Sequence, residues 1–225
     1  LIEGEDKAVL IDTGTRCADL DKIVGQITGK PLEVIVTHMH PDHAGCIKYF
    51  DKVWMHRADT VLVPQHAADY QGEFLYMEEG QVFDLGGRKL EVAWMPGHTP
   101  GSVVLLDKAN GDCYSGDAFG SGEVWLQCVP MSPIATFHES CCRMEKLMKE
   151  GHIKDIWCGH YPYLKSSLPL AYIQTMIRIS HRLMNGDQEG SEPYSNYFIK
   201  MPPTARKLAE GRAMIVYDST NIPEA

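Results

Sequence analysis

Three histidines and an aspartate fall within six residues of this chain, directly after a run of β-branched residues. The run Glu33–Thr37 (EVIVT) is typical of a buried strand. The polar residues that follow it are His38, His40, Asp42 and His43. Crowding four such side chains into a small volume is costly unless they bind something in common. The sequence therefore predicts a buried strand that ends in a functional loop.

The spacing inside this cluster indicates what it binds. In an extended segment, residues two apart share a side, so His38 and His40 can converge on one ion. Pro41 forces a turn, after which Asp42 and His43 point elsewhere and can bind a second ion. Imidazole and carboxylate groups are common ligands of divalent metals. The cluster therefore predicts a metal site.

Three further metal-capable side chains follow predicted strands later in the chain. They are His98, Asp117 and His160, and each comes directly after a glycine. Glycine allows the backbone to bend inward at the end of a strand. These residues complete a candidate set of seven ligands.

Short apolar runs alternate with helical patterns along the whole chain. Strands are expected at 7–11, 33–37, 52–56, 90–95, 103–106, 112–115, 153–158 and 213–217. The capping-box spacing of Thr136 to Glu139 predicts one helix start, and Ser166 or Ser167 is expected to cap the next helix. Residues 187–211 are polar and rich in turn formers, which predicts a surface excursion. The alternation favours a sheet with flanking helices, of α/β or α+β class.

Charge and length exclude several classes of protein. With 30 acidic and 21 basic residues the net charge is −9, which disfavours a nucleic-acid partner. No run approaches the roughly 20 apolar residues of a membrane span. The seven cysteines form no CxxC pair, which predicts reduced thiols in a cytoplasmic protein. The chain begins at Leu1 inside a strand-like pattern, so we expect its natural N-terminus to lie upstream.

The H-x-H-x-D-H cluster, followed in order by His98, Asp117 and His160, resembles the metallo-β-lactamase superfamily. The resemblance implies one domain over residues 1–225, with an αββα sandwich of two mixed β-sheets flanked by helices and a dinuclear metal site at the sheet edge. It assigns one ion to His38, His40 and His98, and the other to Asp42, His43 and His160, with Asp117 as the bridge. Asp12, in an Asp-Thr-Gly stretch, matches a recurrent family element that makes hydrogen bonds in the loop.

The chemistry implied by this resemblance is hydrolysis. Two cations roughly 3.5–4 Å apart share a water and lower its pKa towards neutrality. The chain is thus expected to be a metal-dependent hydrolase whose dinuclear-site hydroxide attacks a small thioester or ester-like substrate. Asp42 would orient the hydroxide and carry its proton to the leaving group. Zinc is the expected metal, with iron or manganese as alternatives.

The identity of the candidate ligands limits which of the family's substrate classes we expect for this chain. Asp117 stands where classical β-lactamases carry cysteine, and His40 stands where flavodiiron oxidoreductases carry glutamate. The set is most similar to glyoxalase II-like thioester hydrolases and to lactonases, although Gly120 stands where quorum-quenching lactonases carry tyrosine. The alternatives are a lactonase or phosphodiesterase with the same site, an iron-dependent redox or oxygen-handling protein, and a metal-stabilised binding module.

Two aromatic-rich segments, 64–81 and 119–133, are candidate lids over the site, with ordered surface loops or a dimer contact as the alternative. The expected partner is a small-molecule substrate. The oligomeric state is left open, with a dimer as one alternative.

Overall fold

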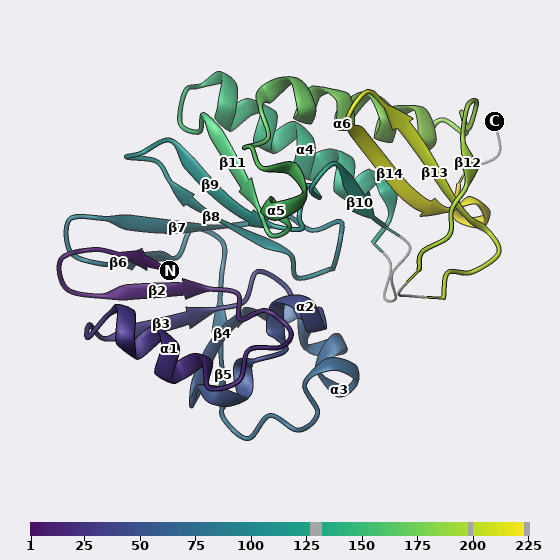
Figure 1. The fold of residues 1–225 in the computed structure, drawn as a ribbon. Coiled ribbons are helices and arrows are strands. Elements are labelled where there is room, and N and C mark those ends of the chain that lie inside the picture. The colour runs from purple at the N-terminus through teal and green to yellow at the C-terminus, as the bar shows by residue number, and fades with distance from the viewer. Residues whose placement is uncertain (127–131, 198–199, 223–225) are drawn as a thin grey trace.

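The computed structural model describes residues 1–126, 132–197 and 200–222, which form three mixed sheets with helices around them (Figure 1). The first sheet has five strands in the order β1-β2-β3-β4-β5. Its strands are β1 (Ile2–Glu3), β2 (Ala8–Ile11), β3 (Leu32–Ile35), β4 (Lys52–His56) and β5 (Glu73–Met77). Only β1 is antiparallel to its neighbour, so β2 to β5 share a direction and end at the same edge.

The second sheet contains five strands in the order β11-β9-β8-β7-β6. They are β6 (Val82–Asp84), β7 (Lys89–Trp94), β8 (Val103–Asp107), β9 (Asp112–Gly116) and β11 (Asp155–Cys158). A third sheet of four strands has the order β10-β14-β13-β12. Its strands are β10 (Glu123–Trp125), β12 (Glu192–Pro193), β13 (Ala205–Glu210) and β14 (Ala213–Asp218).

Helices connect and cover these sheets. The longer ones are α1 (Leu20–Ile27), α4 (Ile134–Lys149) and α6 (Leu170–Met184). The short ones are α2 (Pro41–Ala44), η1 (Ile47–Tyr49), η2 (Arg57–Leu62), α3 (Val63–His66), α5 (Tyr161–Leu164) and η3 (Ser219–Asn221). In Figure 1, α1 covers the outer side of the first sheet, and α4 and α6 cover the outer side of the second. Among the described residues, no helix combines the length and the apolar composition that a membrane span requires.

Three apolar clusters show how these layers pack. The middle cluster joins the two five-stranded sheets and includes Ile35 of β3 and Leu105 of β8. A second cluster lies on the outer side of the first sheet and includes Val24 of α1. The third joins the second sheet to α4, α6 and the third sheet, and includes Phe137 of α4. The order helix, sheet, sheet, helix confirms the predicted fold class, and the third sheet is an addition to it.

Both predicted helix starts are wrong, because each helix begins directly after a proline. Helix α4 begins after Pro133, two residues before Thr136, and α6 begins after Pro169 rather than at a capping serine. Both prolines have extended backbone angles, which leave the chain outside the helix until the following residue. Ser167 donates its hydroxyl to Asp155 instead of capping α6.

Two predicted loops contain strands. Residues 187–211 are not a simple surface excursion, because β12 and β13 lie there and Leu208 is buried. In the segment 64–81, β5 is the edge strand of the first sheet, and the aromatic rings of Tyr70, Phe74 and Tyr76 pack on the outer cluster. The strand β5 is therefore part of the sandwich, whereas His66, at the start of the segment, has its ring centroid 5.8 Å from that of His40 and borders the candidate centre. In the segment 119–133, Phe119 is fully buried, and residues 127–131 lie outside the described part.

Packing between the sheets predicts that alanine substitution of two isoleucines lowers the stability of the protein by very different amounts. Ile35 is 0% exposed between the sheets, whereas Ile27, at the end of α1, is 64% exposed. We expect Ile35→Ala to lower the free energy of unfolding by about 2–5 kcal/mol, because it leaves a cavity. The control, Ile27→Ala, should change it by less than about 0.5 kcal/mol. Urea unfolding measures both, and equal midpoints would contradict the packing described.

Candidate metal centre

All seven predicted ligand residues come together at one edge of the sandwich. His38, His40, Asp42 and His43 follow β3, and His98, Asp117 and His160 follow strands β7, β9 and β11 of the other sheet. The backbone N–H of Val103 donates to the carbonyl of Thr37 at 2.9 Å, so the two sheets are tied together beside the cluster. The ligand atoms form two groups, and within each group they lie within 4.8 Å of one another.

The first group consists of His38, His40 and His98. His40 Nδ1 lies 3.0 Å from His98 Nε2, and the ring centroid of His38 is 4.8 Å from each of the other two rings. Burial lowers the pKa of all three imidazoles, and that of His40 falls to about 3. At neutral pH these rings are uncharged, so each has one nitrogen lone pair to offer.

The second group consists of Asp42, His43, Asp117 and His160. His160 Nε2 lies 3.0 Å from Asp117 Oδ2 and 3.3 Å from Asp42 Oδ2. His43 Nε2 lies 3.5 Å from Asp117 Oδ2. Asp117 Oδ2 is also 3.9 Å from His98 Nε2. Asp117 therefore stands between the two groups, where the resemblance places the bridge.

Charge is concentrated in the second group. Burial opposes charging of His43, but the carboxylates of Asp12 and Asp117 outweigh it and hold the pKa of His43 well above its usual value. Hydrogen bonds to Asp117 and Asp42 raise the pKa of His160 to about 10. Burial opposes ionisation of Asp117, yet the neighbouring His160 and His43 keep its pKa well below the usual value. Asp117 is therefore ionised, and the two histidines beside it supply the positive charge that a buried carboxylate needs.

The outward nitrogens of the buried histidines are held by other groups. His98 Nδ1 donates to the carbonyl of Trp125 at 2.9 Å, which leaves its Nε2 as an acceptor facing the first group. His43 Nδ1 contacts Asp12 Oδ2 at 2.7 Å. Such outer partners fix the tautomer and ring orientation of metal-ligating histidines. Asp12 also accepts from the Thr37 N–H at 2.7 Å, so it makes the loop hydrogen bonds predicted for it.

Three atoms of the seven candidate ligands are buried and have no hydrogen-bond partner among the described residues. They are His38 Nε2, His43 Nε2 and Asp117 Oδ1. An unsatisfied buried polar atom costs about 1–3 kcal/mol. Nitrogen and carboxylate oxygen donors in this arrangement suit divalent transition metals. The residues present therefore fit the pair of ions that the resemblance implies.

The glycines beside the ligands allow the strand ends to approach the cluster closely. A Cβ on Gly159 would lie 2.5 Å from His43 Cε1 and 3.0 Å from Asp117 Oδ1. Gly116 has a φ of +49°, and a Cβ there would collide with Thr37 Oγ1. The strand ends can pack against the cluster only because these positions lack side chains.

Asp59 is a structural partner of the centre that sequence reasoning missed. It is 1% exposed, and it accepts from Met39 N at 2.9 Å, Thr99 Oγ1 at 3.0 Å and Gly101 N at 2.6 Å. It thereby joins the loop of His38 and His40 to the loop of His98. A single aspartate in a polar stretch gives no sequence signal of such a role.

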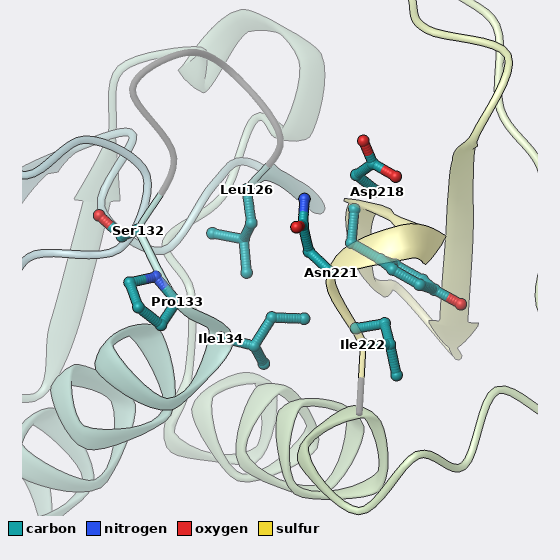
Figure 2. A pocket seen from close by; sticks show the side chains of 8 residues that line it. Leu126, Ser132, Pro133, Ile134, Asp218, Asn221 and Ile222 are labelled. Atoms are coloured by element: carbon teal, nitrogen blue, oxygen red, sulfur yellow. The ribbon is translucent and has the colours of Figure 1, made fainter. Parts of the chain in front are cut away.

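A hollow of about 260 Å³ lies near the first residues of α4 (Figure 2). It is lined by Leu126, Ser132, Pro133, Ile134, Tyr217, Asp218, Asn221 and Ile222. None of the seven candidate ligands lines it. The hollow is linked to the centre along the backbone, because Leu126 directly follows Trp125. The carbonyl of Trp125 accepts a hydrogen bond from His98 Nδ1.

Comparison with known proteins places this geometry in context. The family model described as "Metallo-beta-lactamase superfamily" matches residues 1–138. The chain is 26% identical over 200 residues to a human protein named "Acyl-coenzyme A thioesterase MBLAC2", covering 72% of this chain and 71% of that protein. It is 27% identical over 177 residues to the hydroxyacylglutathione hydrolase of Aeromonas salmonicida, covering 76% of this chain and 63% of the relative.

A solved structure shows the same fold. The protein TTHA1623, crystallised in a di-iron-bound form, superimposes with a TM-score of 0.57 at 27% identity. The match covers 72% of this chain and 84% of that protein. The likeness bears out both the predicted fold and the predicted family resemblance.

The role of Asp59 predicts a graded loss of stability. Asp59→Ala leaves the buried donors of Met39, Thr99 and Gly101 without their acceptor. We expect the free energy of unfolding to fall by about 3 kcal/mol or more. Asp59→Asn keeps one acceptor oxygen and should lose less. Urea unfolding of the three proteins measures the order, and an Ala variant as stable as the parent would contradict the role described.

Proposed function

The chain belongs to the metallo-β-lactamase superfamily, and on this basis we propose that it is a metal-dependent hydrolase of small thioester or ester-like molecules. The observation that carries the proposal is the convergence of seven histidine and aspartate side chains in two adjoining groups. The names of two relatives support the substrate class, since a thioesterase acting on acyl-coenzyme A and a hydrolase of hydroxyacylglutathione both release an acyl group from a thiol.

The two groups define which residues would hold each ion. His38, His40 and His98 would hold the first, and Asp42, His43 and His160 the second, with Asp117 between them. Two divalent cations, when bound, supply an acidified water as nucleophile and positive charge for the substrate oxygen. Zinc is the proposed metal, and iron stays an alternative because the solved relative TTHA1623 holds two iron ions.

Exposure shows from which side a substrate can reach the centre. The side chains of His43 and His98 are 3% and 5% exposed, so a substrate cannot reach the centre from their side. The side chains of Asp42 and His160 are 46% and 33% exposed. Because Asp42 is the exposed member of the two groups, the proposed approach of the substrate carbonyl is over Asp42 and His160.

Asp42 is the residue best placed to move a proton. Burial opposes its ionisation, but the hydrogen bond with His160 outweighs it and lowers the pKa of Asp42, so the carboxylate is ionised at neutral pH. An ionised, accessible carboxylate at the open side can take a proton at Oδ2 and pass it to the departing thiolate or alkoxide.

A lactonase of the quorum-quenching type is less well supported. Gly120 has a φ of +70°, and a Cβ on it would collide with the carbonyl oxygen of Glu123. A tyrosine at this position would need a different backbone. The chain therefore has no place here for the hydroxyl that the lactonase interpretation requires.

Removing one ligand tests the metal dependence. His40→Ala takes away a nitrogen that lies 3.0 Å from His98 Nε2, and we expect bound metal to fall by at least one ion per chain and hydrolysis to be lost. The control is His152→Ala, because His152 is exposed and outside both groups. Elemental analysis and a thioester assay read out the result, and full metal content in His40→Ala would contradict the assignment.

A substrate panel tests the reaction itself. Acyl thioesters of coenzyme A and glutathione, a lactone, a β-lactam and a phosphodiester would be offered to the zinc-loaded and the iron-loaded protein. We expect thioesters to be cleaved fastest with zinc. No cleavage of any thioester or ester by either form would overturn the proposal.

The contact between Asp12 and His43 predicts an effect on metal affinity without loss of a ligand. Asp12→Ala removes the partner of His43 Nδ1 at 2.7 Å, and we expect metal affinity or activity to fall about 10–100-fold. The matched control is Asp21→Ala, on the exposed side of α1. Competition with a coloured chelator measures the affinity, and equal affinities in both variants would contradict the role of Asp12.

A further inference from the structure

A second group of metal-capable side chains lies where α4 packs against α6, outside the seven-residue centre. Cys142 Sγ lies 3.5 Å from His138 Nε2, one helical turn away on α4. The ring of His181, on α6, has its centroid 6.0 Å from that of His138. We propose that Cys142, His138 and His181 form an accessory site for a thiophilic divalent metal such as zinc, separate from the candidate catalytic centre.

The hydrogen bonds of Ser180 aim a lone pair of His138 at the cysteine. The Ser180 hydroxyl donates to the carbonyl of Met176 at 2.7 Å, so its oxygen accepts from His138 Nδ1 at 2.9 Å. Nδ1 therefore carries the proton of the neutral ring, and Nε2 carries the lone pair. Burial lowers the pKa of His138, which favours the neutral ring. His138 is thus oriented by an outer hydrogen-bond partner, as His98 and His43 are in the main centre.

The spacing of the two α4 atoms matches a shared tetrahedral ion. With a zinc–sulfur bond of about 2.3 Å and a zinc–nitrogen bond of about 2.0–2.1 Å, the two ligand atoms on a tetrahedral ion are roughly 3.6 Å apart. The observed separation of Cys142 Sγ and His138 Nε2 is 3.5 Å. Residues at positions i and i+4 of a helix lie on the same face, so α4 presents both ligands without any rearrangement.

His181 supplies the third ligand from the neighbouring helix. Its ring centroid is 6.0 Å from that of His138, and the Asn185 amide nitrogen lies 3.3 Å from its Nδ1 and 3.4 Å from its Nε2, so binding needs the ring to turn away from Asn185. The side chain of His181 is exposed, so its ring can turn towards the pair on α4. A water would complete the four-coordinate site, as in other sites with three protein ligands.

Binding at this site exchanges a proton for the metal. Burial, together with Glu145 and Glu139, raises the pKa of Cys142, so the thiol is protonated at neutral pH in the absence of metal. When the metal binds, the S–H bond breaks, the sulfur–metal bond forms and the proton passes to solvent. The same acidic neighbours that disfavour a free thiolate favour a cation beside it.

Cobalt(II) distinguishes this site from the main centre, because a bound thiolate gives a near-ultraviolet charge-transfer band and the seven residues of the main centre include no cysteine. We expect metal-free protein titrated with cobalt to develop this band with a stoichiometry of one thiolate-bound ion per chain. Cys142→Ser should abolish it. The control is Cys158→Ser, since Cys158 is the buried cysteine that precedes His160 by two residues, and it should keep the band.

Two more variants make the outcome independent of the proposed function. His40→Ala should keep the band even if it loses catalytic metal, whereas His138→Ala should lose it. Alkylation of Cys142 by iodoacetamide, followed by mass spectrometry, should slow at least tenfold on addition of zinc in the parent and not in His138→Ala. A missing band, a band that survives Cys142→Ser, or zinc-independent alkylation would show a thiol–imidazole hydrogen bond only and overturn the proposal.

Discussion

The ionised carboxylate of Asp117 is the group on which the candidate centre depends. Its side chain is 13% exposed where the two sheets meet, and a largely buried charge is tolerated only beside compensating groups. His43 and His160 provide that compensation at 3.5 and 3.0 Å, and each comes from a different sheet. The charge of one side chain is therefore balanced by residues from strand ends that are far apart in sequence, and these contacts link the two sheets at the candidate centre.

The sequence could predict the members of the centre because their chemistry is unusual and their positions are regular. Each of the seven follows a strand, and strand ends on one edge of a sandwich meet in space. The structure brings them together in the grouping expected from the turn at Pro41, with His38 and His40 in one group and Asp42 and His43 in the other. That these groups bind metal stays a prediction. The apolar runs predicted most strands of the two five-stranded sheets, but not β1, β5 and β6.

Other features had no comparable signal. Asp59 acts through backbone donors of Met39 and Gly101, and backbone groups leave no mark on the sequence pattern. Strand β13 was missed because its buried residues, Ala205 and Leu208, are separated by charged and polar ones. The aromatic residues of 64–81 suggested a lid, yet an edge strand also needs large side chains on its covered face. In each case tertiary contacts, rather than local preference, decide the structure.

The third sheet contacts the centre through the carbonyl of Trp125, which accepts from His98. β10 is held in parallel register by β14, with Trp125 opposite Val216, and this pairing aims the Trp125 carbonyl at His98. A slip of one residue in that pairing would point the carbonyl towards β14 instead of His98, because backbone carbonyls alternate between the two sides of a strand. β14 lies beyond the stretch matched by the family model, so a strand outside that stretch holds in place the carbonyl that fixes the proton of His98 on Nδ1. Substitutions in β14 can therefore move the Trp125 carbonyl and change the tautomer of His98, although none of the seven candidate ligands is altered.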